Sequence, residues 1–115
     1  MSYTYYHNPH CSKSRAGLEL LQEKDVDFKV KEYLKEPLSE QELFALFEAL
    51  GKSPGEVLRT KESIYTELKL KDKNLSSSQW AQIIIKNPVL LERPILVCGS
   101  KARIGRPTED LLEIL

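Results

Sequence analysis

Residues 7–15 read His7-Asn8-Pro9-His10-Cys11-Ser12-Lys13-Ser14-Arg15, and the rest of the chain is organised around them. An aromatic run from Tyr3 to Tyr6 precedes them, and apolar residues at helical spacing follow. Asn-Pro is a turn signal, and Cys11 or Ser12 can stand at the N-cap of the helix. The stretch therefore predicts a strand, a turn and a helix, with Cys11 where the unpaired amide N–H groups of the first helical turn converge.

Cys11 is the candidate nucleophile. A cysteine reacts as the thiolate, and at an ordinary pKa of about 8.5 only a few per cent is ionised at neutral pH. Lowering the pKa by about two units requires about 2.7 kcal/mol, whereas a helix N-terminus supplies at most ~2 kcal/mol. Lys13, Arg15 and either histidine are close enough in sequence to supply the remainder, and such a site would also receive an oxyanion. His7, at the strand end, is better placed for this than His10, which we expect to face solvent.

The alternative is that Cys11 is a small buried apolar residue, as free cysteine often is. Its polar and cationic neighbours argue against this, because burying them would leave many groups without hydrogen-bond partners. Cys98 lies inside an apolar run and is expected in the core. Position 14 is serine, so Cys11 has no C-x-x-C partner and should persist as a thiol.

Length and composition predict one soluble domain over residues 1–115. Seventeen basic residues balance seventeen acidic ones, so there is no overall positive field to attract nucleic acid or an anionic membrane. No apolar run approaches the roughly 18 residues of a membrane span, and no leader pattern opens the chain. The two cysteines have neither a disulfide framework nor metal-ligand spacing. We expect a cytoplasmic protein, monomeric, with no bound cofactor or metal.

The rest of the chain alternates strand and helix signals. Phe28 and Val30 alternate with charged residues, which is typical of a strand with one buried face. Helix signals then follow in four places: a capping box at Ser39 and Glu42 with Gly51 as C-cap, a start at Ser53-Pro54 for a short helix carrying Val57, Leu58 and Arg59, a helical stretch within Thr60–Leu70, and a capping box at Ser76 and Gln79 before Asn87-Pro88.

Strand character returns at Ile95 to Cys98 and at Lys101 to Ile104, on either side of a Gly99-Ser100 hairpin turn. A final helix runs through Leu111, Leu112 and Leu115. The sequence thus predicts an α/β fold, a βαβ unit followed by a ββα unit, with a nearly all-helical insertion over about residues 39–87. The first crossover is long enough for parallel pairing.

Two arginines stand directly before prolines, Arg93-Pro94 and Arg106-Pro107, at the entry and the exit of the hairpin. Proline keeps the preceding residue out of the helical region, which fixes the backbone of each arginine at an element end. Two ordinary surface arginines are the alternative. Arginine is the fitting residue type for an oxyanion, because its planar fork makes paired charge-assisted hydrogen bonds.

The motif around Cys11, together with Arg59, Arg93-Pro94 and Gly105-Arg106-Pro107, resembles the glutaredoxin-coupled arsenate reductases of the ArsC type, over the whole chain. The resemblance implies a thioredoxin-like fold and a cis peptide bond before Pro94. It implies that Cys11 attacks arsenic, that His7 helps to keep the thiolate, and that Ser14 and the three arginines bind the substrate. It also implies glutathione as the external thiol and glutaredoxin as the protein that clears the mixed disulfide.

Two other functions stay open. The Spx-type regulators share the fold and bind RNA polymerase, although they usually carry a C-x-x-C switch that Ser14 removes here. A monothiol, glutaredoxin-like reductase acting on mixed disulfides is also compatible with one cysteine, although three arginines exceed what a glutathione carboxylate requires.

Overall fold

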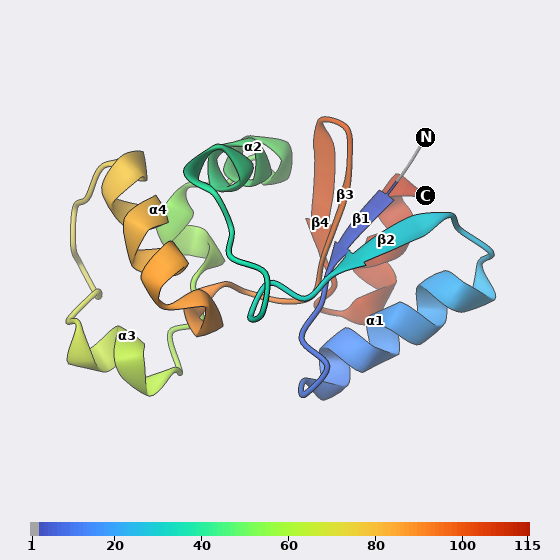
Figure 1. Ribbon diagram of the computed structural model, residues 1–115, viewed down its shortest axis with the longest axis horizontal. Coiled ribbons are helices and arrows are strands. Elements are labelled where there is room, and N and C mark those ends of the chain that lie inside the picture. The colour runs from blue at the N-terminus through green and yellow to red at the C-terminus, as the bar shows by residue number, and fades with distance from the viewer. Residues whose placement is uncertain (1–2) are drawn as a thin grey trace.

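The computed structural model describes residues 3–115, so Met1 and Ser2 of the expected domain lie outside the described residues. The chain forms a four-stranded sheet in the order β2-β1-β3-β4 (Figure 1). Its elements are β1 Tyr3–Tyr6, α1 Ser12–Glu23, β2 Phe28–Lys31, α2 Glu40–Leu50, the 3-10 helix η1 Pro54–Val57, α3 Ser63–Glu67, α4 Ser77–Lys86, the 3-10 helix η2 Pro88–Leu90, β3 Ile95–Cys98, β4 Lys101–Ile104 and the 3-10 helix η3 Thr108–Ile114.

The strand pairing confirms the predicted α/β class. β1 pairs in parallel with β2 across the α1 crossover, and it pairs antiparallel with β3, Tyr5 standing opposite Leu96. β3 and β4 form the predicted hairpin, whose turn residue Gly99 has a φ of 59°. That left-handed conformation suits a residue without Cβ. The first half is thus βαβ and the second half is ββ followed by a helix, as a thioredoxin-like sheet requires.

Two apolar clusters pack against opposite faces of this sheet. Tyr5 and Leu96 face α1 and η3, where Leu21 and Leu111 complete a small cluster. Tyr6 and Ile95, the neighbours of Tyr5 and Leu96 in sequence, belong instead to the larger cluster that includes the helices of the insertion. Successive strand residues point to opposite faces, so the alternation in β1 and β3 divides the core in two.

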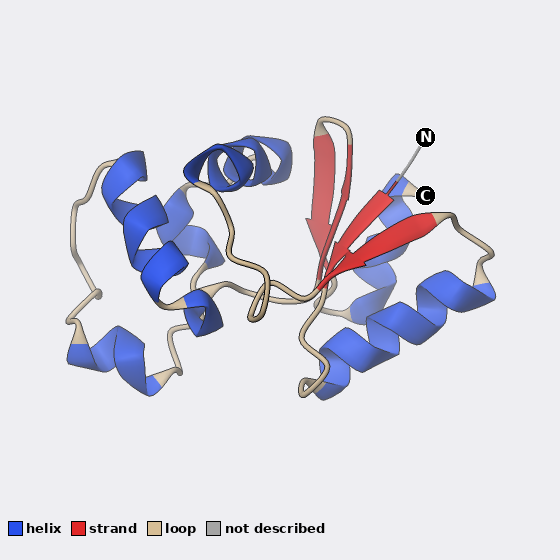
Figure 2. Cartoon of the chain, viewed as in Figure 1, coloured by secondary structure: helices blue, strands red, loops and turns tan. Residues whose placement is uncertain are grey.

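The helical insertion occupies one end of the molecule and the sheet the other (Figure 2). Both predicted capping boxes are present, Ser39 with Glu42 and Ser76 with Gln79, and Gly51 ends α2 at a φ of 66°. The insertion is less helical than predicted at 58–62, where a non-helical segment separates η1 from α3. The non-helical segment at 68–76 agrees with the sequence, whose lysine-rich stretch at Lys69, Lys71 and Lys73 is typical of a solvated loop. Short α3 covers only the middle of the predicted Thr60–Leu70 stretch.

The short helix after Ser53 ends earlier than predicted. It is a 3-10 helix that stops at Val57, and Leu58 instead forms an isolated antiparallel bridge with Leu91. The N–H of Arg59 donates to the carbonyl of Leu90 at 2.7 Å. Both leucines of the bridge are buried. The prediction that Leu58 and Arg59 are helical was wrong because apolar burial against residues 90–91 favours an extended backbone there.

The prediction of one buried face for β2 was only half right. Phe28 packs against the Tyr5 cluster, whereas Val30 is 43% exposed. β2 is an edge strand, with β1 as its only neighbour among the described strands of the sheet. The alternation of apolar and charged residues shows that Phe28 and Val30 lie on the same face of the strand. It does not show how much of that face a helix covers.

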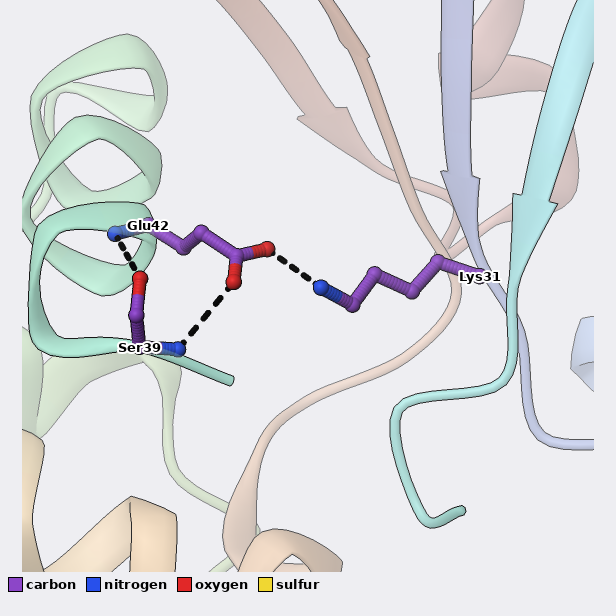
Figure 3. A network of polar contacts seen from close by, with 3 residues as sticks. All are labelled: Lys31, Ser39 and Glu42. Atoms are coloured by element: carbon purple, nitrogen blue, oxygen red, sulfur yellow. Dashed lines mark hydrogen bonds and ion pairs between the residues drawn. The ribbon is translucent and has the colours of Figure 1, made fainter. Parts of the chain in front are cut away.

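One ion pair joins the sheet to the insertion. Lys31, the last residue of β2, donates to Glu42 in the first turn of α2, and the other carboxylate oxygen of Glu42 accepts from the Ser39 N–H at 3.1 Å (Figure 3). The capping box therefore also fixes the partner of Lys31. Within residues 3–115, no helix has the length and apolar character needed to cross a membrane.

Candidate active site

Cys11, one of the two residues predicted for that position, is the N-cap residue of α1, with extended backbone angles and a half-buried side chain. The preceding turn holds it in place: the Cys11 N–H donates to the carbonyl of Asn8 at 3.0 Å, and the Asn8 side-chain oxygen accepts from the N–H of His10 at 3.0 Å. The Asn8-Pro9 turn therefore delivers the thiol to the start of the helix.

The surroundings of Cys11 favour the thiolate. Burial raises the pKa of the Cys11 thiol, but the N–H of Ser14, the charge of Arg93 and the N–H of Lys13 outweigh burial, and the pKa lies below its ordinary value. Opposite charge and hydrogen bonds both stabilise the ionised form. The sequence predicts that helix amides and a nearby cation lower this pKa together, and the cation is Arg93.

Arg93 and Arg106 belong to one network beside the sulfur. The Nη2 of Arg106 lies 3.8 Å from the Sγ of Cys11, and its Nε donates to the carbonyl of Arg93 at 2.7 Å. The carboxylate of Glu92 lies 3.2 Å from the same Nε and also accepts from the N–H of Arg93 at 3.2 Å. Both Arg-Pro peptide bonds are cis, as predicted before Pro94 and not predicted before Pro107.

Arg59 reaches this network from the insertion. It lines a hollow of about 230 Å³ together with Lys61, Glu92 and Arg106. Its Nη1 is buried and makes no hydrogen bond to another described residue. The structure thus brings Arg93 and Arg106 to Cys11, and it brings Arg59 to Arg106 across the hollow.

Ser14 does not line the site as predicted. Its side chain is fully buried, and its hydroxyl lies 2.7 Å from the Nδ1 of His7 while accepting from the N–H of Asn8 at 2.9 Å. Its carbonyl accepts from the hydroxyl of Tyr5 at 2.6 Å. Ser14 therefore supports the turn from behind, and only its backbone N–H acts on the thiol.

His7 lies in this supporting layer too. Burial lowers the pKa of His7, while Glu32 raises it and Arg15 lowers it further, and the net pKa is below the ordinary value. At neutral pH the ring is therefore uncharged, with Ser14 as its hydrogen-bond partner. His10 is exposed, as expected.

The side chains of Lys13 and Arg15, the cations nearest to Cys11 in sequence, are not the charges that lower its pKa. Lys13 and Arg15 are both exposed, and the guanidinium of Arg15 donates to the carbonyl of Pro9 at 3.0 Å. Cys98 is 6% exposed within β3, which confirms its predicted place in the core.

Tyr33 is a residue of the site that the sequence did not reveal. It follows β2 in a turn, is 1% exposed, and its hydroxyl makes no hydrogen bond within the described chain. Burial raises its pKa, and the charges of Arg93, Cys11, Glu92 and Arg106 all act on it. No motif marks an aromatic residue in a turn, and its position among charged residues in sequence was the only available signal.

Three buried side-chain atoms lack a hydrogen-bond partner within residues 3–115: the hydroxyl of Tyr33, Nη1 of Arg59 and Nε of Arg93. Every one of them is a donor, and they come from three separate segments. Buried polar groups are normally paired, so an exception requires an explanation. A group rich in acceptor oxygens would pair with all three. Within the same residues, no three His, Cys, Asp or Glu side chains gather as metal ligands.

Comparison with known proteins identifies the family of this chain. Residues 6–114 match the ArsC family. The chain belongs to the ArsC family. An ArsC relative from Haemophilus influenzae named arsenate reductase is 42% identical, with all of both chains covered. The protein YfgD of Escherichia coli is 49% identical over 96% of this chain and 93% of its own length.

A solved structure named arsenate reductase from Vibrio cholerae superposes on this ArsC chain with a TM-score of 0.94. It is 44% identical, and the match covers 100% of this chain and 98% of that chain. The predicted resemblance and the thioredoxin-like fold of the ArsC family are both confirmed.

Proposed function

We propose that the protein is an arsenate reductase in which Cys11 is the nucleophile. The observation that carries the proposal is the Cys11 thiol at the N-cap of α1, its pKa lowered by Ser14, Arg93 and Lys13, with Arg106 at 3.8 Å. Family membership and relatives named arsenate reductase support arsenate as the substrate.

Arsenate is a tetrahedral oxyanion, and arginine forks bind such groups by paired charge-assisted hydrogen bonds. Arg93 and Arg106 lie at the sulfur, and Arg59 borders the adjoining hollow. In this position they would hold the arsenate oxygens and offset the charge that gathers on them as sulfur approaches arsenic.

The thiolate of Cys11 would form a sulfur–arsenic bond while one arsenate oxygen leaves as water. A glutathione thiol supplies the second sulfur. The glutathione thiolate would attack the sulfur of Cys11, so that a sulfur–sulfur bond forms as the sulfur–arsenic bond breaks. The electron pair of the broken bond stays on arsenic, which leaves as arsenite, and a disulfide between Cys11 and glutathione remains. Glutaredoxin would reduce that disulfide. An external thiol fits a chain in which Cys98, the other cysteine, is buried in β3.

The test is arsenate-dependent oxidation of NADPH in the presence of glutathione, glutaredoxin and glutathione reductase. Cys11→Ser should abolish turnover and leave the fold intact, because a hydroxyl cannot replace a thiolate as a soft nucleophile. Cys98→Ser is the matched control and should retain activity, with some loss of stability from the buried hydroxyl.

Omitting one component at a time assigns the reductant. Loss of turnover without glutaredoxin supports the proposed route, and turnover that persists with glutathione alone contradicts the glutaredoxin step. An inactive but folded Cys98→Ser variant would replace the external-thiol route by an intramolecular disulfide. No arsenate-dependent turnover under any condition, beside capture of RNA polymerase, would favour a regulator.

A further inference from the structure

Tyr33 combines an apolar anchor with an unused donor. Its ring belongs to the larger apolar cluster, together with Leu38 and Ile84, and the residue is 1% exposed. Its hydroxyl oxygen is equally buried and makes no hydrogen bond to any residue of the described chain. Leaving such a group unpaired costs free energy, since hydration is lost and nothing replaces it.

The charges that act on this hydroxyl are those of the site. Arg93, Cys11, Glu92 and Arg106 each influence it, two favouring ionisation and two opposing it, and burial keeps the phenol protonated. Glu92 and Arg106 are paired to each other at 3.2 Å, and neither is a described partner of the hydroxyl. The phenol is therefore a neutral donor at the edge of the Cys11 network.

The other two unpartnered buried atoms, Nη1 of Arg59 and Nε of Arg93, are donors as well. Two of these three groups can only donate, and the third, a hydroxyl, can donate as well, so together they are suited to a ligand made of acceptor oxygens. The side chains of Glu92 and Arg106 are 26% and 33% exposed, so side-chain movement at the surface of this network can admit such a ligand.

We propose that the Tyr33 hydroxyl is a further substrate-binding group, which donates a hydrogen bond to an oxygen of the oxyanion held at Cys11. This inference rests on the proposed function and adds to it a neutral donor beside the three arginines. A neutral donor provides direction without adding charge, so it orients the oxyanion.

The test is calorimetric binding of arsenate, and separately of inorganic phosphate, to the wild type and to Tyr33→Phe. The substitution removes the hydroxyl and keeps the ring in the core. Affinity for the oxyanion should fall about tenfold or more. The free energy of unfolding without anion should be unchanged or increased, because the hydroxyl has no partner to lose.

Tyr6→Phe is the matched control. Tyr6 is also buried in the larger cluster, and the charge that acts on its hydroxyl is that of Glu42. This variant should bind both anions as the wild type does. A Tyr33→Phe variant that keeps wild-type affinity would overturn the Tyr33 role and leave the arsenate proposal standing. A wild type that binds neither anion would overturn both.

A measurement on the wild type covers the case of a variant that does not fold. In proton NMR, a buried tyrosine hydroxyl that gains an anionic acceptor should show a resonance shifted downfield and protected from solvent exchange when arsenate is added. A Tyr33 hydroxyl resonance that does not respond to arsenate would refute the proposal.

Discussion

Two arginines act on the Cys11 sulfur, and they are not equivalent. Arg106 lies 3.8 Å from the sulfur but shares its charge with Glu92 at 3.2 Å. Burial raises the pKa of Cys11. The N–H of Ser14 and, next in size, the charge of Arg93 lower it. A cation already paired with a carboxylate has less charge to offer the thiolate, so Arg93 should govern the titration of the thiol. Arg106 should act mainly through the hydrogen-bond donors of its fork that remain free to contact the oxyanion.

The first prediction follows from Arg93. The rate of Cys11 alkylation by iodoacetamide, plotted against pH, should have its midpoint below the ordinary cysteine pKa of about 8.5, because the thiolate persists to lower pH. Arg93→Ala should move the midpoint upward. Arg103→Ala is the control, since Arg103 pairs with Glu113 at 3.1 Å and should leave the midpoint in place. Identical curves for all three proteins would assign the low pKa to the helix amides alone.

Arg106 carries the second prediction. Arg106→Ala should lower kcat/KM for arsenate about ten- to a hundredfold, the loss expected for one charge-assisted contact of about 1.5–3 kcal/mol realised in the transition state. Arg106→Lys should recover little, because lysine has no fork with which to contact both the carbonyl of Arg93 and an oxyanion. Steady-state kinetics with wild-type kcat/KM in Arg106→Ala would remove Arg106 from the site, and wild-type kcat/KM in Arg106→Lys would show that a charge without the fork is sufficient.

At the scale of elements, α1 is positioned by close contact with the sheet. A Cβ on Gly17 would collide with the Tyr5 hydroxyl, which donates to the carbonyl of Ser14, and would lie 3.0 Å from the Cδ1 of Leu111. The glycine in the middle of a helix is thus required by packing, although alanine is the better helix former by up to about 1 kcal/mol.

Gly17→Ala tests this contact. We expect net destabilisation by about 1–3 kcal/mol, since overpacking outweighs the gain in helix propensity. Gly55→Ala is the control, because its Cβ would lie 3.8 Å from Trp80, an ordinary contact, and should change stability by less than about 0.5 kcal/mol. Chemical denaturation measures both. A stabilised Gly17→Ala variant would show that propensity dominates.

Local signals predicted the elements well where a specific hydrogen bond defines an end. The serine capping boxes and the left-handed Gly51 and Gly99 are examples. The exposure of Val30 and the early end of η1 were not predictable in this way, because they depend on which distant segment covers or pairs with them.

The residues of the site also differ in whether neighbouring residues in sequence are enough to predict them. The position of Cys11 at a helix start followed from its own neighbours in sequence, whereas the gathering of Arg59, Arg93 and Arg106 depends on the tertiary fold and was expected only from the family resemblance. For Tyr33 the only local signal was an aromatic residue among charged neighbours, which does not point to a site. The burial of Ser14 was missed because a serine in a first helical turn is usually exposed and free to bind a ligand.

At the scale of the whole molecule, the sheet and the insertion are joined across their apolar contact by Lys31 and Glu42 (Figure 3). Partial burial raises the pKa of Glu42, but the hydrogen bonds from Lys31 and Ser39 outweigh it, and the net pKa lies below the ordinary value. A depressed carboxyl pKa contributes stability that is complete above the ordinary value of about 4.3 and disappears as pH falls through the lowered pKa.

A double-mutant cycle of Lys31→Met and Glu42→Gln should give a coupling of about 0.5–1 kcal/mol at pH 7, typical of a partly exposed pair. The coupling should vanish at a pH below the lowered pKa, and it should shrink in high salt. Urea denaturation at two pH values supplies the numbers. A coupling that is the same at both would mean that the pair does not act through its charge.

The bridge between Leu58 and Leu91 brings the two ends of the segment 58–91, which contains α3 and α4, next to each other. Arg59 follows Leu58 directly, and Arg93 lies two residues after Leu91. Doubling a flexible loop costs only about 0.6 kcal/mol in closure entropy. The loop at 68–76 can therefore lengthen or shorten without moving either guanidinium, so the part of the chain most tolerant of changes in length lies between two residues whose spacing must stay constant.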